Sequence, residues 1–147
     1  MKQQATTSAP AAPAEFRLLL SSTRRGARLA RTLAVQQLND WCDVPHGSET
    51  AHAVAVVTAE LASNAVAHGC LPGRNFRLTL RLLPHVFRVE VADTRPDAAP
   101  SLTVPPSADG TSGRGLLLVA AHAGRWGCTV HDAYAKTVWA EVRLPSV

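Results

Sequence analysis

The chain is poor in cysteine, in aromatic side chains and in charge, and these shortages exclude several classes of protein. Its three cysteines, Cys42, Cys70 and Cys128, stand far apart and form no CxxC or Cys/His spacing, so neither a disulfide framework nor a zinc site is expected. No run approaches the about 20 apolar residues that span a bilayer, and the N-terminus lacks an apolar core of signal-peptide length. We therefore expect a cytoplasmic protein without a membrane segment.

The remaining composition is that of one globular domain. Of 147 residues, 46% are hydrophobic and 18% are charged, which does not match the low hydrophobicity and high charge of disordered chains. A chain of this length buries roughly two-thirds of its extended surface around a single core. Residues 1–14 are mainly Ala, Pro, Thr, Ser and Gln, so we predict a disordered N-terminal tail followed by a single domain over residues 15–147.

The net charge of +4 comes mostly from scattered arginines, with small clusters at Arg24-Arg25 and Arg28-Arg31. Such clusters permit an acidic partner. Nucleic acid is disfavoured, because the sequence contains no aromatic-rich basic strand and no zinc-finger spacing.

Hydrophobic periodicity predicts an α+β fold. The first long helix is expected to begin at a cap on Ser22 or Thr23 and to bury Leu29, Ala30, Leu33 and Leu38, and the second to run from a cap at Ser48 to His68, with Gly69 at its end. Alternating segments predict strands, and a proline-rich loop over 94–112 precedes a short helix. The expected order is strand 16–21, helices 22–41 and 49–68, strands 75–83 and 86–93, helix 113–124, and strands 125–132 and 135–145. This order favours a layer of helices on one face of a mostly antiparallel sheet.

The second helix carries an unusual polar stripe in "ELASNAVAHG", where Glu60, Asn64 and His68 recur every four residues. They overlap the apolar face of the helix, which is formed by Val54, Val57, Leu61 and Ala65. A carboxylate and a carboxamide placed together suit a hydrated magnesium ion that substrate phosphates complete. The alternative is that these side chains bond one another or nearby backbone, or that this end of the helix is exposed.

Two other motifs stand where elements begin or end. In "GTSGRGL", Gly110 to Leu116, glycines at a helix start let backbone amides approach a phosphate, although such glycines also occur for packing. In "VEVADTR", Asp93 ends an alternating strand. A carboxylate there can accept a hydrogen bond from the exocyclic amine of adenine, but Asp is also a common turn former.

The order "ELASNAVAHG", "VEVADTR", "GTSGRGLLLV", "AKTVWAEV" resembles the GHKL ATP-binding family, whose Bergerat fold is a two-layer sandwich, and within it the short bacterial anti-sigma-factor serine/threonine kinases. The resemblance covers about residues 15–145. It implies ATP and Mg²⁺ as cofactors, Asn64 as the magnesium ligand, and Glu60 as the carboxylate that orients or deprotonates the attacking group. It further implies nucleotide contacts from His68, from Asp93, from the segment Gly113, Arg114, Gly115 and Leu116, and from Thr137, which would help Asp93 through water.

Three functions remain open at this point. The first is a kinase that moves the ATP γ-phosphate to a small antagonist protein, with a sigma factor as the competing partner and a homodimer as a permitted state. The second is an ATP-dependent binding module with little or no transfer, favoured by Arg95, which replaces a glycine common in the family, and by a short proline-rich lid. The third is a scaffold domain with coincidental motifs. A histidine kinase is disfavoured because no phosphoacceptor helix pair precedes the domain, and a gyrase-type protein because no transducer domain follows Val147.

Overall fold

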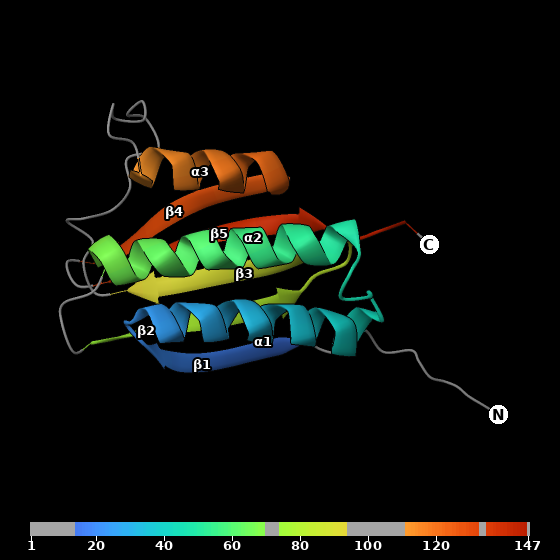
Figure 1. Ribbon diagram of the computed structural model, residues 1–147, viewed down its shortest axis with the longest axis horizontal. Coiled ribbons are helices and arrows are strands. Elements are labelled where there is room, and N and C mark those ends of the chain that lie inside the picture. The colour runs from blue at the N-terminus through green and yellow to red at the C-terminus, as the bar shows by residue number, and fades with distance from the viewer. Residues whose placement is uncertain (1–13, 70–73, 94–110, 133–134, 147) are drawn as a thin grey trace.

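The computed structural model describes residues 14–69, 74–93, 111–132 and 135–146. The expected order of elements is confirmed (Figure 1): β1 (Glu15–Ser21), α1 (Arg24–Cys42), α2 (Glu49–Asn64), a π-helical turn η2 (Ala65–Gly69), β2 (Asn75–Leu82), β3 (Val86–Asp93), α3 (Thr111–His122), β4 (Arg125–Asp132) and β5 (Ala135–Arg143). The predicted tail, the loop over 94–110 and Arg95 lie outside the described residues. Within the described part, no helix is long and apolar enough to cross a membrane.

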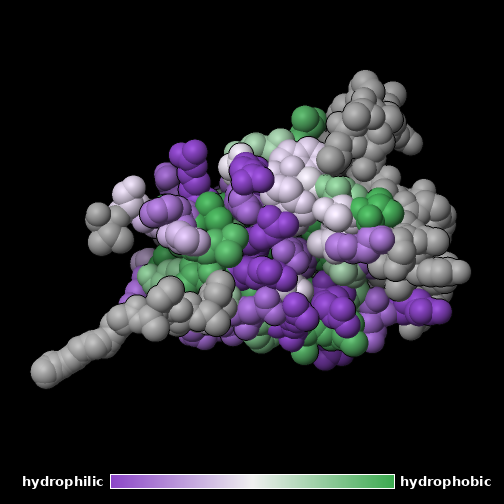
Figure 2. Space-filling view, turned by 180° about the vertical axis from the view of Figure 1, so that it is seen from behind, coloured by the Kyte–Doolittle hydropathy of each residue, from purple (hydrophilic) through white to green (hydrophobic). Residues whose placement is uncertain are grey.

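The five strands form one antiparallel sheet in the order β1-β2-β3-β5-β4. The helices α1, α2 and α3 all lie on one face of it (Figure 1). The other face is covered largely by hydrophilic side chains (Figure 2), among them Arg88, whose guanidinium donates to Glu90 at 2.7 Å and to Glu141 at 2.8 Å. This arrangement confirms the α+β, two-layer prediction.

Apolar side chains alternate with polar ones along the strands, and the apolar side chains lie on the face of the sheet that packs against the helices. Phe76, Leu78 and Leu80 of β2 are fully buried, as are Phe87 and Val89 of β3. Successive side chains of a strand point to opposite faces, so the residues between them face the hydrophilic side. The core therefore lies between the sheet and the helices.

The helices begin at the predicted caps. The Thr23 hydroxyl accepts a hydrogen bond from the Gly26 amide at 3.0 Å, and the Ser48 hydroxyl accepts one from the Ala51 amide at 3.1 Å. Each bond satisfies an amide that has no partner within the helix itself.

Two details of the helices differ from expectation. The buried stripe of α1 consists of Ala27, Ala30, Ala34 and Leu38, whereas Leu29 is 45% exposed, because it lies off the narrow face that small residues bring close to the sheet. The second helix is α-helical only to Asn64 and continues as the π-helical turn η2 to Gly69. Single π-helical turns of this kind are frequent at functional sites.

Candidate functional site

The predicted site residues come from four elements that meet at one edge of the domain. The last turns of α2 and the end of β3 lie at the same edge as the start of α3 and the start of β5 (Figure 1). The helix α2 packs on β3, β5 and α3. The fold thus brings Glu60, Asn64 and Asp93 to the region where α3 begins.

The polar stripe of α2 is only partly enclosed. Glu60 and Asn64 are half-buried, and the apolar positions of the same helix, Val54, Val57 and Leu61, are fully buried. The structure records no hydrogen bond or ion pair for the Glu60 carboxylate within the described ranges. His68 belongs to η2, and its side chain lies outside the description.

Asn64 carries a buried polar atom without a partner. Its Nδ2 is shielded from solvent and makes no hydrogen bond among the described residues. By contrast, the buried Thr58 hydroxyl on the same helix donates to the Val54 carbonyl at 2.7 Å. Buried polar groups are nearly always paired, so an orphan of this kind indicates a missing ligand, ion or water.

The Asn64 carboxamide fits a magnesium ion. Rotating the amide by half a turn exchanges its nitrogen and oxygen, which would place a carbonyl oxygen in the orphaned position, and oxygen is the ligand atom that magnesium prefers. Among the described residues, no group of three or more His, Cys, Asp or Glu side chains could hold a metal. Magnesium in proteins usually keeps several waters and is completed by substrate phosphates, so a single amide oxygen is compatible with such a site.

At the end of β3, Asp93 forms a buried ion pair that the sequence analysis missed. Its Oδ2 lies 3.3 Å from the Nζ of Lys136 on β5, and both side chains are 2% exposed. The two residues face each other in the register of β3 and β5. The available signal was the alternation in "AKTVWAEV", which places Lys136 on the same face as the buried Val138 and Ala140.

Thr137 is not brought together with Asp93. In the strand register it pairs with Ala92, so its side chain points to the face opposite Asp93 and Lys136. There its Oγ1 lies 2.8 Å from the Nε2 of His131. The predicted role of Thr137 beside Asp93 stays a prediction.

The part of the glycine motif that the structure describes, residues 111–116, lies within the first turns of α3, which begins at Thr111, two residues before the expected start at Gly113. Gly110 lies outside the described residues. Arg114, Gly115 and Leu116 are part of this helix, although their side chains are not described. The first amides of a helix have no partner inside it and carry a partial positive charge, which favours an anion.

Cys128 on β4 lies near the ion pair. Burial is the main reason that the pKa of its thiol is raised; Asp93 raises it further, whereas Lys136 lowers it. A thiol with a raised pKa is largely protonated at neutral pH and is a poor nucleophile. We therefore assign Cys128 no covalent role.

Two hollows lie outside this region. One, of about 470 Å³, runs between α1 and α2 and is lined by Arg24, Arg28 and Arg31 together with Ala59 and Ser63. The start of α1 and the end of α2 lie side by side (Figure 1), so this arginine groove adjoins the turn that carries Glu60 and Asn64.

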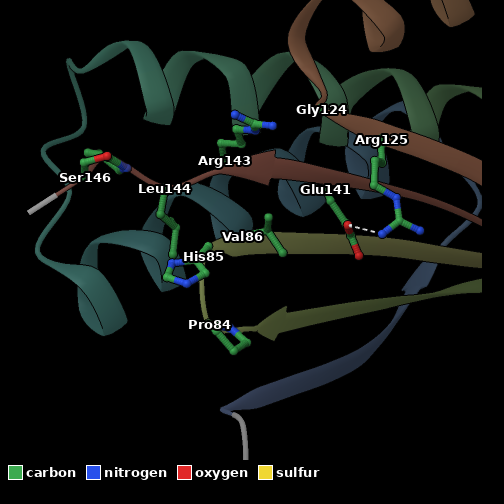
Figure 3. Close-up of a pocket in the computed structure, with 10 residues that line it drawn as sticks. Pro84, His85, Val86, Gly124, Arg125, Glu141, Arg143, Leu144 and Ser146 are labelled. Carbon is green, nitrogen blue, oxygen red and sulfur yellow. Dashed lines mark ion pairs between the residues drawn. The ribbon is translucent and has the colours of Figure 1, made fainter.

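The other hollow, of about 840 Å³, opens at the far end of β5, away from Asn64 and Asp93. Figure 3 shows Arg125 reaching toward Glu141 across it, at 3.6 Å. Because its acidic side chain is already paired with arginine, this hollow presents a salt-bridged surface rather than a reactive group.

Residues 23–135 match the family model described as the histidine kinase-like ATPase domain. No curated protein matched the chain.

Proposed function

The chain belongs to the histidine kinase-like ATPase domain family, which makes it an ATP-binding protein, and we propose from this premise that it is a serine/threonine protein kinase of the anti-sigma-factor type. It would transfer the ATP γ-phosphate to a small antagonist protein. The observation that supports the proposal is the position of Asn64 and Glu60, whose side chains have an amide nitrogen and a carboxylate without a partner among the described residues, at the edge of the domain where β3 ends with the buried Asp93.

Each residue has a part that follows from its chemistry. Asp93, as a carboxylate, accepts a hydrogen bond from the exocyclic amine of adenine and disfavours the carbonyl of guanine. The first amides of α3, those of Thr111 to Arg114, would face the phosphates, and Gly113 and Gly115 would let the phosphates approach this helix start. Asn64 at the end of α2 would hold the magnesium ion at the phosphate end of the nucleotide, and His68, which belongs to η2, would contribute a further contact to the nucleotide. When bound there, a magnesium ion supplies charge neutralisation for the transferred phosphoryl group.

Glu60 is the proposed catalytic carboxylate. The hydroxyl oxygen of the antagonist attacks the γ-phosphorus, the bond from that phosphorus to the bridging oxygen breaks, and ADP leaves with the electron pair. The hydroxyl proton passes to Glu60. In such transfer, positioning and charge stabilisation supply most of the rate, so Glu60 contributes less than the phosphate contacts do.

A protein partner with an acidic surface is supported by the arginine groove. Arg24, Arg28 and Arg31 are exposed and form no ion pair with any described residue. Arg24 and its neighbour Arg25 stand in the first turn of α1, where a positive charge is disfavoured by the helix dipole. These exposed arginines are present although the helix dipole disfavours a positive charge at the start of α1. We propose that they steer an acidic antagonist or sigma factor toward the turn that carries Glu60.

Titration calorimetry with ATP, with and without magnesium, tests the nucleotide site. The wild type is compared with Asn64→Ala and with Gln36→Ala, an exposed carboxamide on α1 that serves as the control. We expect Asn64→Ala to remove the magnesium-dependent part of binding and Gln36→Ala to leave it unchanged. Equal binding by both variants would contradict the role of Asn64.

A second experiment separates the kinase from the ATP-dependent binding module. The wild type and Glu60→Gln are incubated with γ-labelled ATP and candidate antagonist proteins, and label on serine or threonine is followed over time. We expect transfer by the wild type and a loss of roughly 100-fold or more in Glu60→Gln, the range typical of general acid–base catalysis. Tight ATP binding without any transfer would favour the binding module.

A further inference from the structure

The ion pair between Asp93 and Lys136 differs from the other ion pairs of the described residues in its burial. Both side chains are 2% exposed, whereas in each of the other pairs at least one side chain is 23% exposed or more. Lysine is almost never fully buried unless it is paired. A second lysine, Lys2, stands near the N-terminus, so the chain places one of only two lysines against this carboxylate.

Stability alone does not account for such a pair. Removing two charges from water costs free energy that their attraction only partly returns, and well-packed apolar residues often serve a core as well or better. The neighbours on the same face, Val91 on β3 and Val138 on β5, are apolar and buried. Packing alone would therefore favour apolar side chains at positions 93 and 136. We infer that the ion pair is kept because the nucleotide site needs it.

We propose that Lys136 is a positioning residue for nucleotide binding: its ammonium keeps the Asp93 carboxylate ionised and holds it turned toward the base. This inference rests on the proposed role of Asp93 as the acceptor of the adenine amine. A carboxylate offers about four lone-pair sites, so an oxygen that faces Lys136 does not prevent the group from accepting another hydrogen bond. Lys136 acts through Asp93 and need not touch the nucleotide.

Without Lys136 the buried carboxyl would favour its neutral form, because desolvation disfavours charge and the compensating cation would be gone. A neutral carboxyl carries a proton on one oxygen and accepts the adenine amine less well. Among the titratable side chains that the structure describes near this end of β3, Cys128 of β4 and Glu60 of α2 are not cations, and Arg77 of β2, which pairs with Ala92, points to the opposite face of the sheet. On the face that carries Asp93, none of these three described side chains takes the place of the Lys136 ammonium.

The test compares ATP affinity over pH in the full-length wild type, Lys136→Met and Lys136→Arg, each in the presence of magnesium. Affinities are expressed as ratios to the wild type at the same pH, which cancels the titration of the nucleotide itself. For Lys136→Met we expect the ATP affinity relative to wild type to fall as the pH drops from about 8 to about 5.5. The fall should be at most tenfold per pH unit, because a single protonation gives that slope. For Lys136→Arg, which keeps the charge, we expect a ratio that is constant over this range.

Thr58→Val is the control for destabilisation, because it removes a buried hydroxyl bond of α2 at 2.7 Å without touching the ion pair. Its ratio should not change with pH. A constant ratio for Lys136→Met, or a pH dependence shared by Lys136→Arg, would overturn the role of Lys136 while leaving nucleotide binding intact. Absence of ATP binding by the wild type at every pH would overturn the proposed function as well.

If Lys136→Met does not fold, the wild type alone decides the question. A carbon-detected NMR titration of the Asp93 carboxyl should then show it ionised down to at least pH about 5, one unit above the ordinary value of about 3.9. A carboxyl that gains its proton above that pH is not held ionised by Lys136, and the inference fails.

Discussion

Removing one charge of the buried ion pair between Asp93 and Lys136 should destabilise the domain more than removing both charges together. Lys136→Met leaves the Asp93 carboxylate, 2% exposed, without its counter-charge, which costs roughly 3–5 kcal/mol. Asp93→Leu removes the carboxylate that faces the buried Lys136 ammonium, and we expect a similar cost. The double variant replaces the pair by apolar side chains, and we expect it to lie within about 1–2 kcal/mol of the wild type, because such replacements are often neutral or stabilising.

The pH dependence of Lys136→Met has a definite sign. In this variant the folded state raises the pKa of the Asp93 carboxyl above its unfolded value of about 3.9, because burial is no longer offset by a cation. Below the raised pKa the folded protein binds a proton that the unfolded chain does not, so stability is gained as pH falls. The deficit relative to wild type should therefore shrink from pH about 8 to about 5, while ATP affinity changes in the opposite direction.

Urea denaturation followed by circular dichroism measures all four proteins of this cycle. The experiment is run at about 15 °C, near the temperature of greatest stability for most domains, so that the single variants stay folded. The losses in the free energy of unfolding are then compared. If the loss in the double variant equals the sum of the losses in the two single variants, a direct interaction of Asp93 with Lys136 is refuted. A deficit for Lys136→Met that is the same at every pH would refute the argument from protonation.

Three further predictions follow from close contacts and burial. Gly26→Ala places a Cβ 1.9 Å from a backbone oxygen of β1 and should cost about 3 kcal/mol or more, lowering Tm by roughly 6–12 °C, whereas Gly47→Ala, with nothing within 4 Å, should change Tm little. Gly127→Ala brings a Cβ to 2.8 Å from the Trp139 ring, so it should shift the tryptophan emission and cost about 1–3 kcal/mol; unchanged emission would contradict this contact. Cys128, whose thiol pKa is raised by burial, should react slowly with iodoacetamide at pH 7 and faster as pH rises, as mass spectrometry of the modified peptide can show; fast alkylation at pH 7 would be inconsistent with the raised pKa.

The order of elements and most of the core could be predicted because both follow from local periodicity. Strand alternation in Phe76, Leu78 and Leu80 and the caps at Thr23 and Ser48 are properties of short segments, and the structure confirms them. Leu29 shows the limit of such a prediction. Helical spacing marks an apolar stripe, but which part of the stripe meets the sheet depends on how closely the small residues of α1 let it approach.

The placement of the site residues was likewise predictable where it depends on neighbouring residues and not predictable where it depends on the pairing of distant strands. The sequence by itself determined that Glu60 and Asn64 share one face of a helix, that Asp93 ends a strand and that glycines lie in the first turns of another helix, because each of these is set by neighbours a few residues away. Only the tertiary structure decided that Asp93 meets Lys136 and that Thr137 turns to the opposite face, where it contacts His131. The first fact depends on the register of β3 against β5, strands that are far apart in the chain, and the contact with His131 depends on the pairing of β4 with β5. A shift of one residue in the register of β3 against β5 would turn every side chain of β5 to the other face.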